Sequence, residues 1–245
     1  MRLQCRFLCI MESPPPIRRG PPKTNPGLLE LIRNKRERHW KPSIEELKQG
    51  FRGWHQRGHL PHFDAPGVTQ FITFQLEDSF PVTCKAGWES ILNEPEHNVK
   101  RRKLEAWLDR GHGRCGLFRQ DLAKLVETIL LADNGCDYRM MAWALMPNHV
   151  HLVVEVWDRP LSKLIGGWKG KSARSANDLL GRSGKFWQDD YYDTLIRDQA
   201  HFKQAVSYTE QNPVKVKLAK TAREWPWGSA KWRDNFERLP REKSE

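Results

Sequence analysis

The sequence lacks the features that mark membrane proteins and disulfide-rich secreted proteins. It contains no run of about 18 apolar residues, so no segment is expected to span a bilayer. The five cysteines form no Cys-x-x-Cys pair and their number is odd, which favours free thiols in a reducing cytoplasm. The first eleven residues, MRLQCRFLCIM, are too briefly apolar for a signal peptide and contain no small-residue cleavage site. A cytoplasmic protein is therefore expected.

Positive charge is what the sequence has in excess. The 245 residues include 41 Lys and Arg against 30 Asp and Glu, which gives a formal net charge of +11. Such an excess suits a polyanionic partner, and nucleic acid is the usual one. A basic surface that serves only solubility is the alternative interpretation.

The N-terminal part of the chain carries few apolar residues. Residues 12–27 are rich in Pro and Gly and cannot bury a core. Residues 28–57 are predicted to be helical in two pieces, the second with Ser43 as its N-cap. Residues 57–67, RGHLPHFDAPG, are interpreted as a loop whose histidines have no cysteine partners for a zinc site. We therefore treat residues 1–57 as an N-terminal extension, partly disordered and then helical.

In the rest of the chain, segments whose apolar residues recur at strand spacing alternate with segments whose apolar residues recur at helix spacing. The predicted strands and helices, in chain order, are a strand at 68–76, a helical stretch at 85–109, a helix at 117–133, strands at 136–145 and 149–157, a helix at 159–180, a strand at 190–197, and a helix at 198–212 that stops at Pro213. An α+β fold of the ferredoxin-like kind, a four-stranded antiparallel sheet with packed helices, accounts for this order most simply. The domain is expected over 58–230, with a polar tail at 231–245.

Two histidines interrupt the apolar strand LMPNHVHLVV. Strand side chains alternate between faces, so His149 and His151 project from the same side and Val150 from the other. The pair is either surface polarity or half of a metal site, which needs a third protein ligand. Tyr208 and Asn212, four residues apart, share one face of the last helix and could converge on the pair. Taken separately, Asn212 also fits a helix end before proline, and Tyr208 fits an amphipathic core position.

Four segments in this order resemble a known family. They are MPNHVHLVVEV, FWQDDYYDTLIRD, YTEQNPVKVKLAK and WPWGSA. The chain resembles the REP-associated tyrosine transposases over roughly residues 58–230. These are relatives of the single-strand transposases of small insertion sequences, within the HUH nuclease superfamily.

The resemblance implies roles for particular residues. It maps the family's paired histidine ligands onto His149 and His151, its third metal ligand onto Asn212, and its nucleophile onto Tyr208 rather than Tyr191 or Tyr192. The implied cofactor is Mg²⁺ or Mn²⁺. The implied activity is a metal-dependent endonuclease and strand transferase that acts on single-stranded or hairpin DNA through a covalent 5′-phosphotyrosine, in the cytoplasm at the nucleoid. A homodimer and a single chain are both compatible with the sequence.

The predicted helix at 159–180 is the candidate DNA-binding element. Its proposed DNA contacts are the side chains of Lys163, Trp168, Lys169, Lys171 and Arg174. Cationic side chains neutralise phosphates and an indole stacks on bases, which is the combination that single-strand binders use. A solvated basic face is the alternative.

Two further functions remain open from the sequence alone. A non-catalytic module of the same fold would bind hairpin nucleic acid without cutting it. A metallohydrolase that uses an activated water would need the histidines but not Tyr208.

Overall fold

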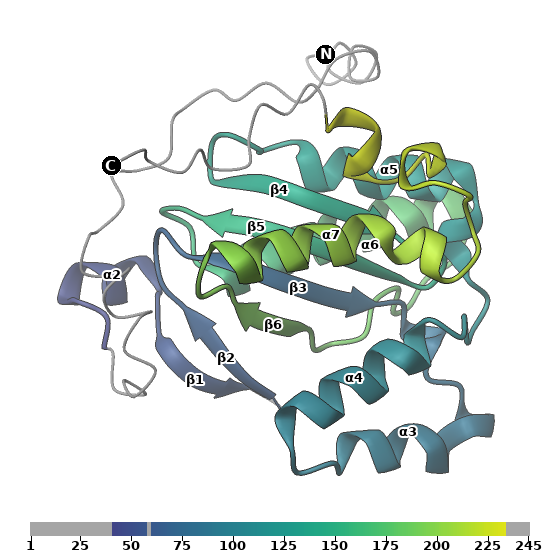
Figure 1. The fold of residues 1–245 in the computed structure, drawn as a ribbon, viewed down its shortest axis with the longest axis horizontal. Coiled ribbons are helices and arrows are strands. Elements are labelled where there is room, and N and C mark those ends of the chain that lie inside the picture. Colours follow the sequence, from purple (N-terminus) through teal and green to yellow (C-terminus); the bar gives the residue numbers. More distant parts are fainter. Residues whose placement is uncertain (1–40, 58–59, 234–245) are drawn as a thin grey trace.

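The computed structural model describes residues 41–57 and 60–233 (Figure 1). Residues 1–40 and 234–245, and with them the first predicted helical piece and most of the predicted tail, lie outside the described residues. No helix in the described part of the chain combines the length and apolarity that crossing a bilayer requires.

The centre of the structure is a four-stranded antiparallel sheet with the strand order β4-β5-β3-β6. Its strands are β3 (Thr69–Gln75), β4 (Tyr138–Leu145), β5 (His149–Val156) and β6 (Tyr192–Leu195). The helices around it are α3 (Lys85–Leu92), α4 (His97–Leu108), α5 (Gln120–Leu131), α6 (Leu161–Leu180) and α7 (Gln199–Lys215). This order and topology confirm the predicted ferredoxin-like α+β fold.

The two faces of the sheet are covered by different helices. Val150, Leu152 and Val154 of β5 face the main core, which α5 and α6 close. The alternate β5 positions face α7, where Val153 packs with Phe202 and Val206 of that helix. In Figure 1, α7 crosses in front of the sheet while α6 lies behind it. Strand alternation therefore assigns the two histidines of β5 to the α7 side.

Along the chain, an additional pair of helices stands between β3 and α5. Helices α3 and α4 pack together through a small apolar cluster made of Ile91, Leu104, Trp107 and Leu108. The indole N–H of Trp107 donates to the carbonyl of Ser79 at 3.0 Å, which ties the pair to the end of β3. The single polar helical stretch predicted for 85–109 is thus a helical hairpin.

The segment before the sheet differs from the sequence prediction. The predicted second helical piece is only the short α2 (Ile44–Gln49), for which Ser43 provides the expected N-cap. Residues that were interpreted as helix and loop form instead a hairpin of β1 (Gly53–Arg57) and β2 (Leu60–Asp64). The prediction was wrong because its turn-like Pro and Gly residues obscured a pairing that long-range contacts stabilise. The hairpin also spans the predicted boundary at residue 57.

Helix α7 continues past Pro213, where the sequence predicted its end. A proline within a helix removes one N–H, here the donor to the carbonyl of Thr209. The following bonds still form, since the N–H of Val216 donates to the carbonyl of Asn212 at 3.2 Å. One missing bond in the last turn is therefore tolerated. Five short 3-10 helices complete the described structure: Glu77–Ser79, Val82–Cys84, Gly116–Phe118, Ala222–Glu224 and Ser229–Trp232.

A buried ion pair fastens the hairpin to the sheet edge. His62 of β2 bonds through Nδ1 to the carboxylate of Asp193 on β6, and its Nε2 lies 3.4 Å from Asp190. Asp193 also accepts the N–H of Phe63 at 3.1 Å. Burial lowers the pKa of His62, but the hydrogen bonds and negative charges of Asp190 and Asp193 outweigh it and raise the pKa to about 9.

This raised pKa predicts a loss of stability in mild alkali. The folded protein retains the His62 proton between the unfolded value near 6.5 and about 9, so the contribution is complete below pH 6.5 and disappears as the pH rises through 9. Asp190 is partly exposed, so solvent screens its interaction with His62. We therefore expect the protonated His62 to contribute about 2 kcal/mol to the free energy of unfolding. Urea unfolding between pH 6 and 9.5 measures it. His62→Gln should flatten this part of the profile, and an unchanged slope in that variant would contradict the assignment.

Candidate active site

The two histidines of β5 lie together beneath α7. Their side chains are almost completely buried, His149 at 1% and His151 at 0% exposure. The two Nε2 atoms are 3.0 Å apart and the rings are nearly perpendicular, at 80°. The strand's alternation explains the shared face, and the short turn at 146–148 holds the first histidine at the start of β5.

The other nitrogen of each imidazole is held by a polar neighbour. His149 Nδ1 lies 2.8 Å from the side-chain oxygen of Asn148, and His151 Nδ1 lies 2.8 Å from the hydroxyl oxygen of Thr73. When these oxygens accept, both Nδ1 atoms carry the proton and both Nε2 atoms present a lone pair to the same point. Such outer partners fix the ring orientation of metal-binding histidines.

Both imidazoles are held in the neutral form. Burial lowers the pKa of His149 well below its usual value, and the adjacent His151 and Lys215 lower it further. Burial and then the charge of Lys215 lower the pKa of His151 to about 3. A neutral imidazole is the form that binds a metal ion.

Helix α7 brings the other two predicted residues to the pair. The side-chain Nδ2 of Asn212, which is 1% exposed, lies 3.3 Å from Nε2 of His151. One turn earlier, the ring of Tyr208 contacts His151 edge to face, with 5.5 Å between the centroids. The structure thus brings together the four residues that the sequence singled out.

The hydroxyl of Tyr208 is in a strongly acidic environment. Its oxygen is buried, and the carboxylate of Glu105 is close enough to interact with it. Burial raises the pKa of this phenol above its ordinary value, and the charges of Glu105 and Asp109 raise it further. Burial likewise raises the pKa of Glu105. The phenol is therefore protonated in the structure as it stands.

Two residues at this site were missed by the sequence analysis. Glu105 and Asp109 occur four residues apart, one within α4 and the other at its C-cap, in the additional helical pair. One carboxylate oxygen of Asp109 and one nitrogen from each of His149 and His151 lie within 4.8 Å of one another. The spacing of the two acidic residues was visible in the sequence, but nothing local indicated which surface they would meet.

The donor set fits a divalent cation. The amide oxygen of Asn212 and Oδ1 of Asp109 are buried without a hydrogen-bond partner among the described residues. Buried polar atoms are nearly always paired, so orphaned oxygens beside two imidazoles mark a place where a partner is missing. Imidazole nitrogens 3.0 Å apart also match neighbouring ligands of one octahedral ion at bond lengths of about 2.1 Å. The residues present therefore fit a divalent cation.

The other three tyrosines occupy different environments. Tyr138 is buried in the main core, with its hydroxyl bonded to the carbonyl of Leu130. Tyr191 belongs to the same core and packs on His62, with 4.5 Å between the ring centroids. Tyr192 begins β6 opposite Thr73 and packs against the α3–α4 cluster. Tyr208, by contrast, packs its ring on His151 of the histidine pair.

The predicted DNA-binding residues lie on the opposite side of the sheet. All five belong to α6, which packs behind the sheet on the face away from the histidines (Figure 1). Lys163, Lys171 and Arg174 are exposed there. A DNA strand bound at the histidines would not reach this surface directly. Contacts of these three residues with DNA farther from the histidines stay a prediction.

Two of the five residues have structural roles instead. Trp168 is only 4% exposed and meets Tyr138 edge to face, so its indole cannot stack on a base. The ammonium of Lys169 donates to the carbonyls of residues 188–190 at 2.8 to 3.2 Å. Because α6 is amphipathic and both side chains are on its inner side, the structure gives no support to direct DNA contacts by these two residues.

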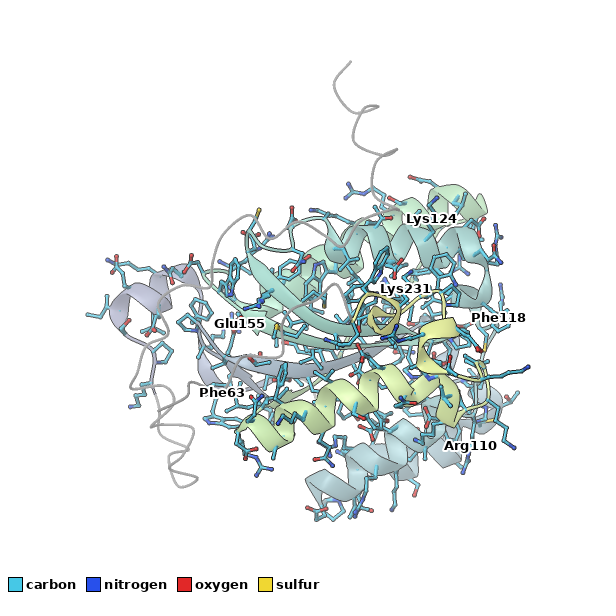
Figure 2. The ribbon with its side chains drawn as sticks, turned by 45° about the horizontal axis from the view of Figure 1, so that its top comes forward. Phe63, Arg110, Phe118, Lys124, Glu155 and Lys231 are labelled. Atoms are coloured by element: carbon cyan, nitrogen blue, oxygen red, sulfur yellow. The ribbon has the colours of Figure 1, made fainter. Side chains whose placement is uncertain are left out.

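Part of the site reaches solvent near the C-terminal ends of α4 and α7. Tyr208 and Asp109 are partly exposed, and Lys215 is exposed. Arg110, the residue after Asp109, is at the surface where α4 ends near the C-terminal end of α7 (Figure 2). Positive charge therefore borders this edge of the site.

Two solved structures show a distant likeness to this chain. A REP-associated tyrosine transposase bound to a REP hairpin has 17% identity and a TM-score of 0.47, with 75% of this chain and 86% of that chain covered. A protein from Deinococcus radiodurans R1 described as an inferred transposase has 14% identity and a TM-score of 0.31, with 63% and 98% covered. No curated protein matches the chain. These likenesses are too distant to establish a shared activity.

A family model gives the more specific result. The model described as "Transposase IS200 like" matches residues 113–212. This range contains β4, β5 and α6, and it ends at Asn212, so both histidines and Tyr208 lie inside it. The match confirms, for residues 113–212, the resemblance to the IS200-like transposases that the sequence motifs indicated.

Proposed function

We propose that the protein is a metal-dependent endonuclease and strand transferase for single-stranded hairpin DNA. The observation that supports this best is the convergence of three residues beside the ring of Tyr208, with His149 and Asn212 lying 3.0 Å and 3.3 Å from His151. Two nitrogen ligands, an amide and a nucleophile are the groups that such a reaction needs. The cytoplasm, at the nucleoid, is the proposed location.

The metal would be held by His149, His151 and Asn212. When bound, Mg²⁺ or Mn²⁺ supplies a Lewis acid that polarises the scissile phosphate and favours in-line attack. The amide oxygen of Asn212 is its ligand atom, and a half-turn of the amide exchanges this oxygen with the nitrogen that now faces His151. Thr73 and Asn148 orient the imidazoles throughout.

Tyr208 would form the covalent intermediate. Its oxygen attacks phosphorus and forms a tyrosine–phosphate bond, while the bond from phosphorus to the 3′ oxygen breaks and leaves a free 3′-hydroxyl. The phosphodiester energy is retained in this link. The 3′-hydroxyl of another strand can therefore reverse the step and join the DNA without an external energy source.

The phenol must lose its proton during the attack, and Glu105 is placed to accept it. After burial, the charge of Glu105 affects the pKa of Tyr208 most. Burial also raises the pKa of Glu105, which makes its carboxylate a stronger base. The leaving 3′ oxygen takes up one proton and becomes a hydroxyl, which matches the one proton that the phenol loses.

Hairpin DNA is the proposed partner for two reasons. The net charge of +11 favours a polyanionic partner. In addition, Asn212 followed by the sequence PVK resembles the REP-associated branch of the family in particular. A binding module that does not cut is the alternative, but it would leave the convergence of Tyr208 with the histidines without a purpose.

Tyr208→Phe tests the nucleophile. The ring and its packing on His151 and Phe71 remain, so the fold should survive. Cleavage and the covalent adduct should both be lost, while hairpin affinity should change by less than about 1 kcal/mol. A denaturing gel after incubation with hairpin DNA and Mn²⁺ detects the adduct. Tyr191→Phe and Tyr192→Phe are the controls and should retain it; an adduct that disappears only in Tyr192→Phe would identify that residue as the nucleophile.

His149→Ala and His151→Ala test the metal site. Each removes one of the two nitrogens that face each other at 3.0 Å, so cleavage at limiting Mn²⁺ should be abolished. DNA binding, measured by fluorescence anisotropy, should be largely retained because neither side chain reaches the surface. Cleavage at the wild-type rate by both variants would refute a metal-dependent mechanism at these residues.

The salt dependence of binding tests the polyanionic partner. Several neutralised phosphates should make hairpin affinity fall steeply as the salt concentration rises. A duplex of the same sequence should compete poorly in the same titration, since the site is expected to take an unpaired strand. Equal competition by the duplex would contradict the single-strand specificity.

A further inference from the structure

The carboxylate of Asp109 comes from a part of the chain that the family match does not include. It caps the C-terminus of α4, four residues before the matched range begins at 113. The surrounding segment is anchored on both sides of this residue. Trp107 bonds to the carbonyl of Ser79 at 3.0 Å, and the side chain of Asn148 donates to the carbonyl of His112 at 3.0 Å. Asp109 is thereby held in place relative to the histidine pair.

Asn148 makes this connection direct. Its amide nitrogen bonds to His112 while its oxygen contacts Nδ1 of His149 at 2.8 Å. One side chain therefore fixes both the end of the additional helical pair and the orientation of the first imidazole. The ring of His112 also stacks on Trp107, with 4.2 Å between the centroids.

The two oxygens of Asp109 have different surroundings. Oδ2 forms an ion pair with the ammonium of Lys215 at 2.6 Å. Oδ1 is buried and has no hydrogen-bond partner among the described residues. The side chain as a whole is 11% exposed and offers an oxygen within 4.8 Å of a nitrogen from each histidine. Lys215 is thus the partner of one carboxylate oxygen, and the other oxygen is buried without a partner among the described residues.

We propose that Asp109 is a ligand of the divalent cation held by His149 and His151. This inference rests on the proposed function and extends its metal site by a carboxylate from outside the matched region. Oδ1 binds the cation, while Lys215 keeps Oδ2 and prevents bidentate binding. The ligand set then carries a negative charge, and a carboxylate oxygen favours hard ions such as Mg²⁺ and Mn²⁺ over softer ones.

Calorimetric titration of the full chain with MnCl₂, in the absence of DNA, tests this proposal without relying on catalysis. Asp109→Asn keeps the size of the side chain but removes its charge, and it should weaken Mn²⁺ affinity by about tenfold or more. Lys215→Met breaks the same ion pair but leaves the carboxylate. It should bind Mn²⁺ as tightly as the wild type or more tightly, because a nearby positive charge is removed. Thermal unfolding without metal verifies that both variants fold.

His149→Ala in the same titration separates this inference from the proposed function. Weak binding by His149→Ala and Asp109→Asn, with tight binding by Lys215→Met, supports the ligand role. Wild-type affinity in Asp109→Asn alongside weak binding in His149→Ala overturns the role of Asp109 alone. Equal weakening in Asp109→Asn and Lys215→Met shows that the ion pair shapes the site, and it also overturns ligation by Asp109. Wild-type affinity in His149→Ala contradicts the metal site itself.

Discussion

The contact between Nε2 of His149 and Nε2 of His151 is the constraint on which the site depends. Two buried imidazoles at 3.0 Å cannot both be charged, and burial keeps both neutral. The arrangement requires a strand that places both rings on one face and oxygen acceptors that fix both Nδ1 atoms. It also requires a helix that covers the pair and brings Asn212 to it. β5, Thr73, Asn148 and α7 meet these requirements.

The environment of Tyr208 shows why the metal and the nucleophile belong to one mechanism. Burial and nearby carboxylates make the phenol a weaker acid than it is in water. Any activation must therefore come from what the site binds or from the group that takes the proton. A cation beside His151 would offset the negative charge of Glu105 and Asp109, and it would thereby lower the pKa of the phenol. Lys215, whose ammonium lies 5.5 Å from the centre of the Tyr208 ring, contributes in the same direction.

Local patterns in the sequence were sufficient for the sheet, and together with the family resemblance they indicated the four central residues of the site. Alternation identified β3, β4 and β5, and helical spacing placed Tyr208 and Asn212 on one face. The β1–β2 hairpin was missed because its stability comes from Asp193, about 130 residues away in the chain. The burial of Trp168 was not visible in the sequence, because a basic helix can still turn one side chain into the core. Asp109 could not have been found, since only the tertiary packing of α4 brings it to the histidines.

Mass spectrometry of the covalent complex tests the central claim most directly. Digestion with trypsin after reaction with hairpin DNA separates the candidate nucleophiles, because QAVSYTEQNPVK contains Tyr208 alone and FWQDDYYDTLIR contains Tyr191 and Tyr192. The account predicts that the 5′-phosphonucleotide mass is found on the first peptide. Its presence on the second peptide, or metal-dependent cleavage that leaves both peptides unmodified, would contradict the claim that Tyr208 attacks the DNA.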